Sequence, residues 1–197
     1  MNPLFANLPV SIFAHMSSLA VKHNAVNLGQ GFPDFGWPDD VVAKAAEALL
    51  AGSNQYAPMR GLPELRRAVA EHYRHHQGVE VDPDWITVTS GATEALAAAI
   101  MALVSPGDEV VLFQPLYDAY LPLVLRAGGV PKLVRLEPPG WRITAEALDG
   151  AFSANTRLVI FNNPHNPTAR VFGADELALV AERCVANDAI ALTDEVW

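Results

Sequence analysis

The chain of 197 residues has a single cysteine, few lysines and no long apolar run. The lone Cys184 excludes an internal disulfide, and its place in an apolar helical pattern predicts a buried thiol rather than a reactive one. The longest apolar stretch, residues 95–104, is far shorter than the about 20 residues that cross a bilayer. The first residues lack the basic start and sustained apolar run of a secretory signal. We therefore expect a cytoplasmic protein with no membrane partner.

Basic residues are also scarce, because 13 Lys and Arg stand against 22 Asp and Glu and give a formal net charge of −9. A nucleic-acid surface needs clustered Lys and Arg to neutralise phosphates, so we expect no nucleic-acid partner. The charge does not exclude a single phosphate site, since a helix N-terminus binds an anion without any basic side chain. Hydrophobic residues make up 51% of the chain, which is typical of a globular protein rather than a disordered one.

The order of the predicted elements indicates an α/β fold. Helical spacing comes first, at residues 11–23, at 39–52 and after Pro63. Short apolar or β-branched runs then alternate with helical patterns. Strands are expected at residues 85–89, 109–113, 130–136, 157–161 and 189–193, and helices at 92–104, 117–126, 144–152 and 174–187. This alternation predicts a mainly parallel sheet that is covered by helices on both faces.

The chain stops at Trp197, directly after the predicted strand at residues 189–193. A natural domain rarely ends on a core strand, because the sheet edge that it leaves needs cover. We therefore expect the chain to be a fragment whose sheet is incomplete at the C-terminus.

Three polar segments follow predicted strands, and ligands of open parallel sheets bind outside the carboxyl ends of the strands. The first segment is Ser-Gly-Ala-Thr at residues 90–93, which opens a predicted helix. A small turn containing glycine lets N–H groups at a helix start approach an anion, and Ser90 and Thr93 add hydroxyl donors. The alternative is that Ser90 only caps the helix. This segment alone leaves both interpretations open.

The second segment is Asn-Asn-Pro-His-Asn-Pro-Thr at residues 162–168. Its two Asn-Pro pairs predict a well-defined loop with outward Asn side chains, which is more than a mere turn needs. His165 has no second His or carboxylate at ligand spacing, so we interpret it as a loop histidine and expect no metal. The third segment is Thr-Asp-Glu-Val-Trp at residues 193–197, after the predicted strand. By itself Asp194 is best explained as a turn residue or a helix cap.

Taken together and in this order, the three segments resemble the aminotransferase class I/II family of pyridoxal-phosphate enzymes, which have fold type I, the aspartate aminotransferase type. The resemblance includes NLGQGFPD at residues 27–34, YAPMRGLPEL at 56–65 and FQPLYDAY at 113–120. The NLGQGFPDF opening most resembles the kynurenine and methionine aminotransferase subgroup. The resemblance implies a three-layer large domain over residues 39–197. Residues 1–38 would form an N-terminal arm and substrate loop, as part of the small domain or its edge.

The resemblance also implies which residues would bind the cofactor, pyridoxal 5'-phosphate. Gly91, Ala92 and Thr93 would hold its phosphate at the helix N-terminus. Tyr117 would stack on the pyridine ring, although a plain core aromatic is the alternative. Asn166 would donate a hydrogen bond to the phenolic oxygen of the ring.

The catalytic role falls to Asp194, which would face the pyridine nitrogen and keep it protonated, so that the ring accepts electrons from the substrate Cα. Tyr56 would reach the phosphate in the neighbouring subunit, which implies a homodimer, and the backbone of Gly31 would line the substrate carboxylate region. Trp197 stands where the family most often has a tyrosine that hydrogen-bonds the phenolic oxygen. Because indole donates but cannot accept, the binding of that oxygen would differ here.

The Schiff-base lysine of the family lies beyond the Asp194 segment, past the end of this chain. The lysines present are Lys22, Lys44 and Lys132, and all three precede that segment. The resemblance therefore implies an aminotransferase that exchanges an amino group between an amino acid and a 2-oxo acid, and a chain that is inactive by itself. Two alternatives stay open. One is a C–S β-lyase of the same fold, and the other is a non-catalytic aminotransferase-like module that binds a ligand or partner.

Overall fold

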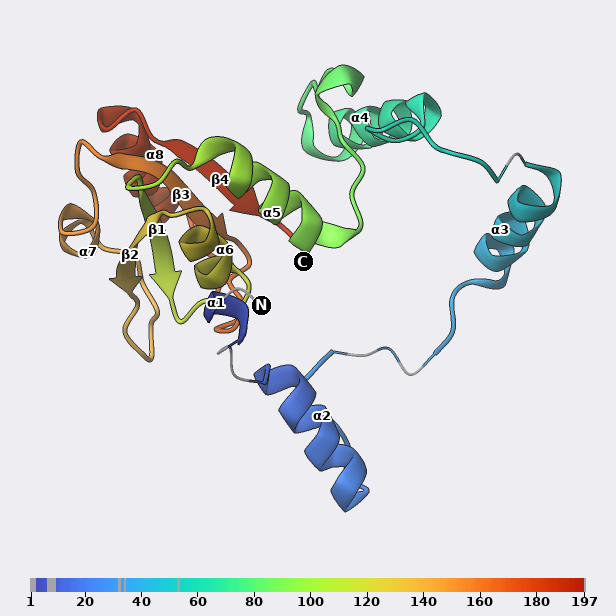
Figure 1. Cartoon of the computed structure of the whole chain (residues 1–197), viewed down its shortest axis with the longest axis horizontal. Helices are drawn as coiled ribbons and strands as arrows, with labels where there is room; N and C mark the ends of the chain where they lie inside the picture. The colour runs from blue at the N-terminus through green and yellow to red at the C-terminus, as the bar shows by residue number, and fades with distance from the viewer. Residues whose placement is uncertain (1–2, 7–9, 32, 34, 53, 197) are drawn as a thin grey trace. The chain divides into compact units, whose positions relative to one another are not determined.

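The computed structural model describes residues 3–6, 10–31, 33, 35–52 and 54–196 (Figure 1). Two units emerge from the contacts between Cα atoms, and each is described by itself. The sheet unit comprises Ser90–Trp197 together with helix α1 (Pro3–Ala6), and the helical unit comprises Pro9–Thr89. This grouping does not test the predicted domain boundary between residues 38 and 39, which stays a prediction.

A four-stranded parallel sheet forms the centre of the sheet unit in the described part of the chain. Its strands are β1 (Glu109–Gln114), β2 (Val130–Arg135), β3 (Thr156–Asn162) and β4 (Ile190–Asp194), in the spatial order β2-β1-β3-β4. Consecutive buried residues fill β1 and β3, which is the pattern of strands that are covered on both faces. The strands predicted at 109–113, 130–136, 157–161 and 189–193 are confirmed.

One face of the sheet is covered by α5 (Gly91–Leu103) and α6 (Tyr120–Arg126). Because successive strand residues point to opposite faces, this face carries the alternate side chains of β1 and β3. They pack with the buried residues of both helices in one cluster, namely Leu96, Ile100, Val104, Val110, Leu112, Tyr120, Val124, Leu158 and Ile160.

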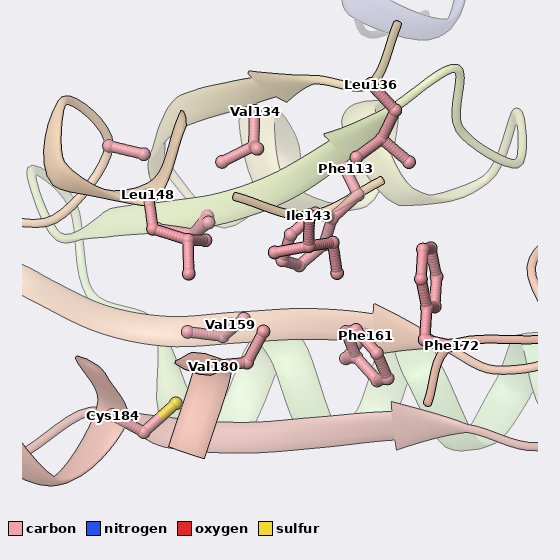
Figure 2. Packing of buried hydrophobic residues seen from close by; sticks show 12 residues of the cluster. Phe113, Val134, Leu136, Ile143, Leu148, Val159, Phe161, Phe172, Val180 and Cys184 are labelled. Atoms are coloured by element: carbon pink, nitrogen blue, oxygen red, sulfur yellow. The ribbon is translucent and has the colours of Figure 1, made fainter. Parts of the chain in front are cut away.

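The opposite face is covered by α7 (Ala145–Asp149) and α8 (Ala174–Ala186). Figure 2 shows this second cluster, in which the rings of Phe113 and Phe161 meet nearly at right angles with centroids 5.5 Å apart. Cys184 of α8 lies in it with 7% exposure, and burial raises the pKa of its thiol, so the prediction of a buried thiol is confirmed. Helices on both faces of a parallel sheet make a three-layer α/β fold, as predicted.

The helical unit contains α2 (Ile12–His23), α3 (Asp39–Ala51), α4 (Pro63–Gln77) and a 3₁₀ turn, η1 (Pro83–Trp85). The three predicted helices are therefore confirmed. Helix α4 has a proline in its first turn and is followed directly by Gly78. The φ of Gly78 is 66°, the left-handed conformation that favours glycine after a helix. None of the residues of α2, α3 and α4 is buried. No helix in the described residues is both long enough and apolar enough to span a membrane.

The strand predicted at residues 85–89 is wrong. Trp85 ends η1, which the Asp82 side chain caps by accepting a 2.8 Å hydrogen bond from the Asp84 N–H. Val88 donates a backbone hydrogen bond to Arg60 O at 3.0 Å, but residues 86–89 join no strand ladder within the described part of the chain. Aromatic and β-branched residues favour extended backbone, whereas a strand also needs a neighbour to pair with.

Candidate active site

The order of the strands leaves a crevice at their carboxyl ends. The connection from β1 to β2 passes through α6 on one face, and the connection from β3 to β4 passes through α8 on the other. Since β1 and β3 are neighbours, the chain leaves them toward opposite faces, which is the arrangement that creates ligand sites in open α/β sheets. A cavity of about 180 Å³ lies there, lined by Ala92, Thr93, Leu96, Tyr117, Tyr120, Asn162, Asn166, Asp194 and Val196.

The start of α5 supplies one wall of this cavity. Ser90 is the N-cap residue, but its side chain makes no cap hydrogen bond, and its N–H donates to the Glu94 carboxylate. Capping by the Ser90 hydroxyl, the alternative interpretation, is therefore not what the structure contains. Gly91 has a φ of +78°, and a Cβ built on it would meet no atom within 4 Å. Because the first-turn amides of a helix have no partner within the helix, this open helix start suits an anion.

Two tyrosines from the segment after β1 form a second wall. The ring of Tyr117 is half-buried and meets the ring of Tyr120 edge-on, with centroids 5.6 Å apart and planes at 74°. Tyr120 opens α6 and is only 4% exposed. Tyr117 thus offers an aromatic surface to the cavity, and Tyr120 supports it from the core.

Asp194 lies at the end of β4 and is 9% exposed. Its Oδ2 accepts a hydrogen bond of 2.6 Å from the Tyr120 hydroxyl, and its Oδ1 accepts one of 3.3 Å from the Val196 N–H. Burial, and then the bond to Asp194, raise the pKa of the Tyr120 phenol far above its usual range. The phenol consequently keeps its proton and acts as the donor in this pair.

The loop after β3 is attached to the end of β4 by asparagine hydrogen bonds. Asn162 donates through Nδ2 to the Asp194 carbonyl at 2.9 Å and accepts the Asn166 N–H at Oδ1 at 2.6 Å. The Asn163 N–H also donates to the Asp194 carbonyl, at 3.2 Å. These bonds fix the backbone that carries Asn166 beside the backbone that carries Asp194, and both side chains line the cavity.

His165 anchors the middle of this loop. It is 3% exposed, its Nδ1 lies 2.8 Å from Thr168 Oγ1, and its ring meets Phe172 at a centroid distance of 5.5 Å. Burial lowers the pKa of its imidazole. These contacts agree with the interpretation as a loop histidine. Nowhere in the described chain do three His, Cys, Asp or Glu side chains gather as a metal site would require.

Glu176 of α8 fixes the far end of the loop and is 2% exposed. It accepts hydrogen bonds from the Ile143 N–H at 2.9 Å, from Arg170 Nη2 at 2.6 Å and from the Gly173 N–H at 3.3 Å. Burial alone would raise the pKa of this carboxyl, but the bonds from Ile143, Arg170 and Gly173 outweigh it and lower the pKa. Glu176 is therefore a buried anion that joins the loop to α8.

The structure brings five of the predicted site residues to the cavity, namely Ala92, Thr93, Tyr117, Asn166 and Asp194, and Gly91 directly precedes the first of them. Gly31 and Tyr56 belong to the helical unit, where the Tyr56 side chain is fully exposed and a Cβ on Gly31 would meet nothing within 4 Å. Trp197 lies outside the described residues. The individual roles of these residues stay predictions.

Four further residues line the cavity without having been predicted, namely Leu96, Tyr120, Asn162 and Val196. A signal was present for two of them. Tyr120 follows Tyr117 by three residues, which is the spacing of one helical turn, and Asn162 stands first in the loop, at the carboxyl end of its strand. Leu96 and Val196 carry no polar group, and nothing in their local sequence distinguishes them from core residues.

Sequence comparison identifies the family to which a protein with this fold and cavity belongs. The model of the family "Aminotransferase class I and II" matches residues 23–197, and the chain belongs to this family. The enzymes of this family depend on pyridoxal phosphate in general. The predicted family resemblance is therefore confirmed, and both methionine and kynurenine aminotransferases occur among the relatives.

Individual relatives are similar along the whole chain. A probable N-succinyldiaminopimelate aminotransferase of Mycobacterium tuberculosis is 48% identical over 190 residues, which are 95% of this chain and 48% of that protein. Methionine aminotransferase of Escherichia coli is 44% identical over 202 residues, covering 100% of this chain and 52% of that one. The solved structure of N-succinyldiaminopimelate aminotransferase from Mycobacterium tuberculosis matches with a TM-score of 0.93 and 46% identity. The match covers 100% of this chain and 52% of that one. The chain thus spans about half the length of the relatives it matches.

Proposed function

We propose that the whole protein is a pyridoxal-phosphate-dependent aminotransferase that exchanges an amino group between an amino acid and a 2-oxo acid. The observation that carries the proposal is the single cavity lined by Ala92, Thr93, Tyr117, Asn166 and Asp194. These residues come from a helix start, from the segment after β1, from the loop after β3 and from the end of β4. A random cavity would not gather an anion-binding helix start, an aromatic face, an amide and a carboxylate.

The donor set of the cavity fits the chemistry of the cofactor. The first turn of α5, with Thr93, offers N–H and hydroxyl donors for a phosphate. The Tyr117 ring offers an aromatic partner for a pyridine face, and the Asn166 amide offers a donor for a phenolic oxygen. The Asp194 carboxylate, as an acceptor, fits a protonated ring nitrogen. The phosphate, the ring face, the phenolic oxygen and the ring nitrogen therefore each have a complementary group in one cavity.

In the proposed reaction these residues position the ring and hold one proton. Asp194 would accept a hydrogen bond from the protonated ring nitrogen and so favour its protonated form, and Tyr117 would shield the ring from water. When bound, the cofactor supplies an electron-withdrawing ring that stabilises negative charge at the substrate Cα. The amides at the start of α5 would hold the phosphate and so keep the ring near Asp194.

The lysine that the chemistry needs is proposed to come from the rest of the protein. Lys22 and Lys44 belong to α2 and α3 of the helical unit, and Lys132 of β2 lies 3.4 Å from the Glu109 carboxylate. The cavity has no lysine among its described lining residues. An amine at the site is required both to bind a carbonyl covalently and to move a proton. We therefore expect the 197-residue chain by itself not to transaminate.

This expectation is tested by treating the purified 197-residue chain with pyridoxal phosphate and borohydride, followed by peptide mapping and an amino-transfer assay. We expect no specifically labelled lysine and no turnover. A single labelled lysine at Lys22, Lys44 or Lys132, together with turnover, would contradict the proposed division of the site.

We further propose that the whole protein acts as a cytoplasmic homodimer. The support is the predicted role of Tyr56, which would bind the phosphate held by the neighbouring subunit, and whose side chain projects from the helical unit into solvent. A sedimentation experiment on the whole protein tests the dimer, and a monomer with full activity would exclude that role for Tyr56.

Substrate assays separate transfer from the alternative β-lyase reaction. The whole protein is given L-methionine with a 2-oxo acid in one assay and cystathionine in the other. We expect the 2-oxo acid of methionine to form in the first assay, and little pyruvate and thiol to form in the second. The relatives reported above are named as aminotransferases, which supports transfer. Predominant pyruvate release would favour the lyase.

A further inference from the structure

Tyr120 connects the hydrophobic core of the sheet unit to the cavity. Its ring belongs to the buried cluster with Leu96 and Val124, and it is 4% exposed. The same ring meets the edge of Tyr117, and its hydroxyl reaches Asp194 Oδ2 at 2.6 Å. One side chain therefore contacts both residues that would bind the pyridine ring, one at the ring face and one at the ring nitrogen.

The direction of the hydrogen bond follows from the two groups. A carboxylate only accepts, and an O–H···O bond of 2.6 Å is in the range of charge-assisted bonds. Burial and the Asp194 carboxylate raise the pKa of the Tyr120 phenol, so the phenol keeps its proton and is the donor at neutral pH. The Val196 N–H binds the other oxygen of the same carboxylate. With one donor on each oxygen, the plane of the carboxylate is fixed while lone pairs on both oxygens remain for a ligand.

We propose that Tyr120 is a positioning residue for the cofactor ring, because its hydroxyl aims the Asp194 carboxylate at the ring nitrogen and its ring supports the stacking face of Tyr117. The inference rests on the proposed function, since it requires the cofactor in this cavity. Packing alone does not account for the hydroxyl, because phenylalanine would fill the same space in the core cluster. The hydroxyl instead ends on the carboxylate at the cavity wall.

The test uses the whole protein without its cofactor and the variant Tyr120→Phe, which keeps the ring and removes the donor. The ligand is pyridoxamine 5'-phosphate, whose affinity reports the noncovalent contacts and needs no turnover. We expect Tyr120→Phe to bind it roughly 10- to 100-fold more weakly, the range for a hydrogen bond to a charged group. The analogue with carbon in place of the ring nitrogen should bind Tyr120→Phe and wild type alike. Tyr73→Phe in α4 is the matched control and should leave both affinities unchanged.

A double-mutant cycle with Asp194→Asn keeps the test decisive if Tyr120→Phe loosens the fold. If the hydroxyl acts through the carboxylate, Tyr120→Phe should weaken binding little further in the Asp194→Asn background. An equal loss in both backgrounds, or an equal loss for the ligand and its carbon analogue, would show a merely structural role and overturn the inference. Unchanged affinity of Tyr120→Phe would overturn it as well. If the wild-type protein itself fails to bind pyridoxamine 5'-phosphate, the proposed function falls together with the inference.

Discussion

The two units of the chain both contain helices with apolar stripes, yet they differ in what those stripes contact. In the sheet unit, α5 buries Leu96 and Ile100 against the strands. In the helical unit, α2, α3 and α4 bury none of their residues, and Leu49 and Leu50 of α3 are 65% and 89% exposed. Apolar side chains of the sheet unit pack against other residues of that unit, whereas many apolar side chains of the helical unit are exposed.

This difference shows that apolar periodicity and helix-end residues are enough to specify a helix. Whether the apolar side chains of that helix are buried depends on a second helix or sheet that packs against them. Exposed apolar helix faces are typical of surfaces that bind another part of a protein or another chain. The candidate site follows the same division. The residues that line the cavity all lie in the sheet unit, whereas Gly31 and Tyr56 belong to the helical unit and their roles in the site stay predictions.

The largest effect is expected for Asp194→Ala in the whole protein, because the ring nitrogen would lose the group that keeps it protonated. Turnover should fall by roughly three orders of magnitude or more, as for loss of an interaction that stabilises the transition state. The rate of transfer from L-methionine to a 2-oxo acid measures it. Asp40→Ala in the first turn of α3 is the matched control in the helical unit and should remain near normal. Near-normal transfer by Asp194→Ala would remove Asp194 from the site.

The difference in burial itself is tested by a pair of leucine variants in the 197-residue chain. Leu112 of β1 is 0% exposed, so Leu112→Ala should lower the free energy of unfolding by about 2–5 kcal/mol through lost burial and a cavity. Leu49→Ala in α3 should change it by less than about 0.5 kcal/mol. Urea unfolding measures both values. Equal costs would show that the two units are packed alike, and the comparison would fail.

A smaller effect is expected for Glu176→Gln, which removes the buried anion that joins the loop to α8. The free energy of unfolding at neutral pH should fall by about 1–3 kcal/mol, because the hydrogen bond to Arg170 loses its charge. Since the folded pKa of Glu176 is lowered, its contribution is fully present above the ordinary value of 4.5 and is lost as the pH falls through the lower folded value. The difference between wild type and variant should therefore shrink in acid.

The matched control for Glu176 is Glu64 in the helical unit, which forms an exposed pair with Arg67 at 3.0 Å. Glu64→Gln should leave urea unfolding at neutral pH unchanged, because exposed ion pairs contribute little. If the two glutamine variants unfold alike, Glu176 does not join the loop to α8 as the hydrogen bonds indicate.

The smallest effect is expected for Tyr56→Phe in the whole protein. Loss of one hydroxyl donor to a phosphate should weaken the binding of pyridoxamine 5'-phosphate roughly tenfold, near the lower limit for bonds to charged groups. Equilibrium titration of the protein without cofactor measures it, with Tyr73→Phe as the control tyrosine. An unchanged affinity would mean that the exposed Tyr56 side chain does not complete the site of a neighbouring subunit.

Much of the fold was predictable because the strands of the sheet unit are short apolar runs between helical patterns. The strands at residues 109–113 and 157–161 lie within a residue of β1 and β3. The strand at residues 85–89 could not be judged from its own residues, since local preference says nothing of a partner strand. Burial in the helical unit was unpredictable for the same reason.

The candidate site was predictable where a residue type and its place in a family motif agree. Asn166 lies in the loop after β3 and Asp194 ends β4, and both line the cavity. Tyr120 was missed because a tyrosine on the apolar side of a helix is ordinarily a core residue, and it is indeed one here. Its hydroxyl becomes meaningful only through a contact across 74 residues of sequence. A hydrogen bond between residues so far apart in the sequence is found only in the three-dimensional structure.

The departure of the chain toward opposite faces of the sheet after β1 and after β3 has an evolutionary consequence. The side chains that hold the sheet together lie within the strands, whereas most residues of the cavity lie in the segments that follow β1 and β3 or at the start of α5. Mutations in those segments can alter what the cavity accepts while the strands remain unchanged. A gene encoding this architecture can therefore diversify by substitution at one end of the sheet.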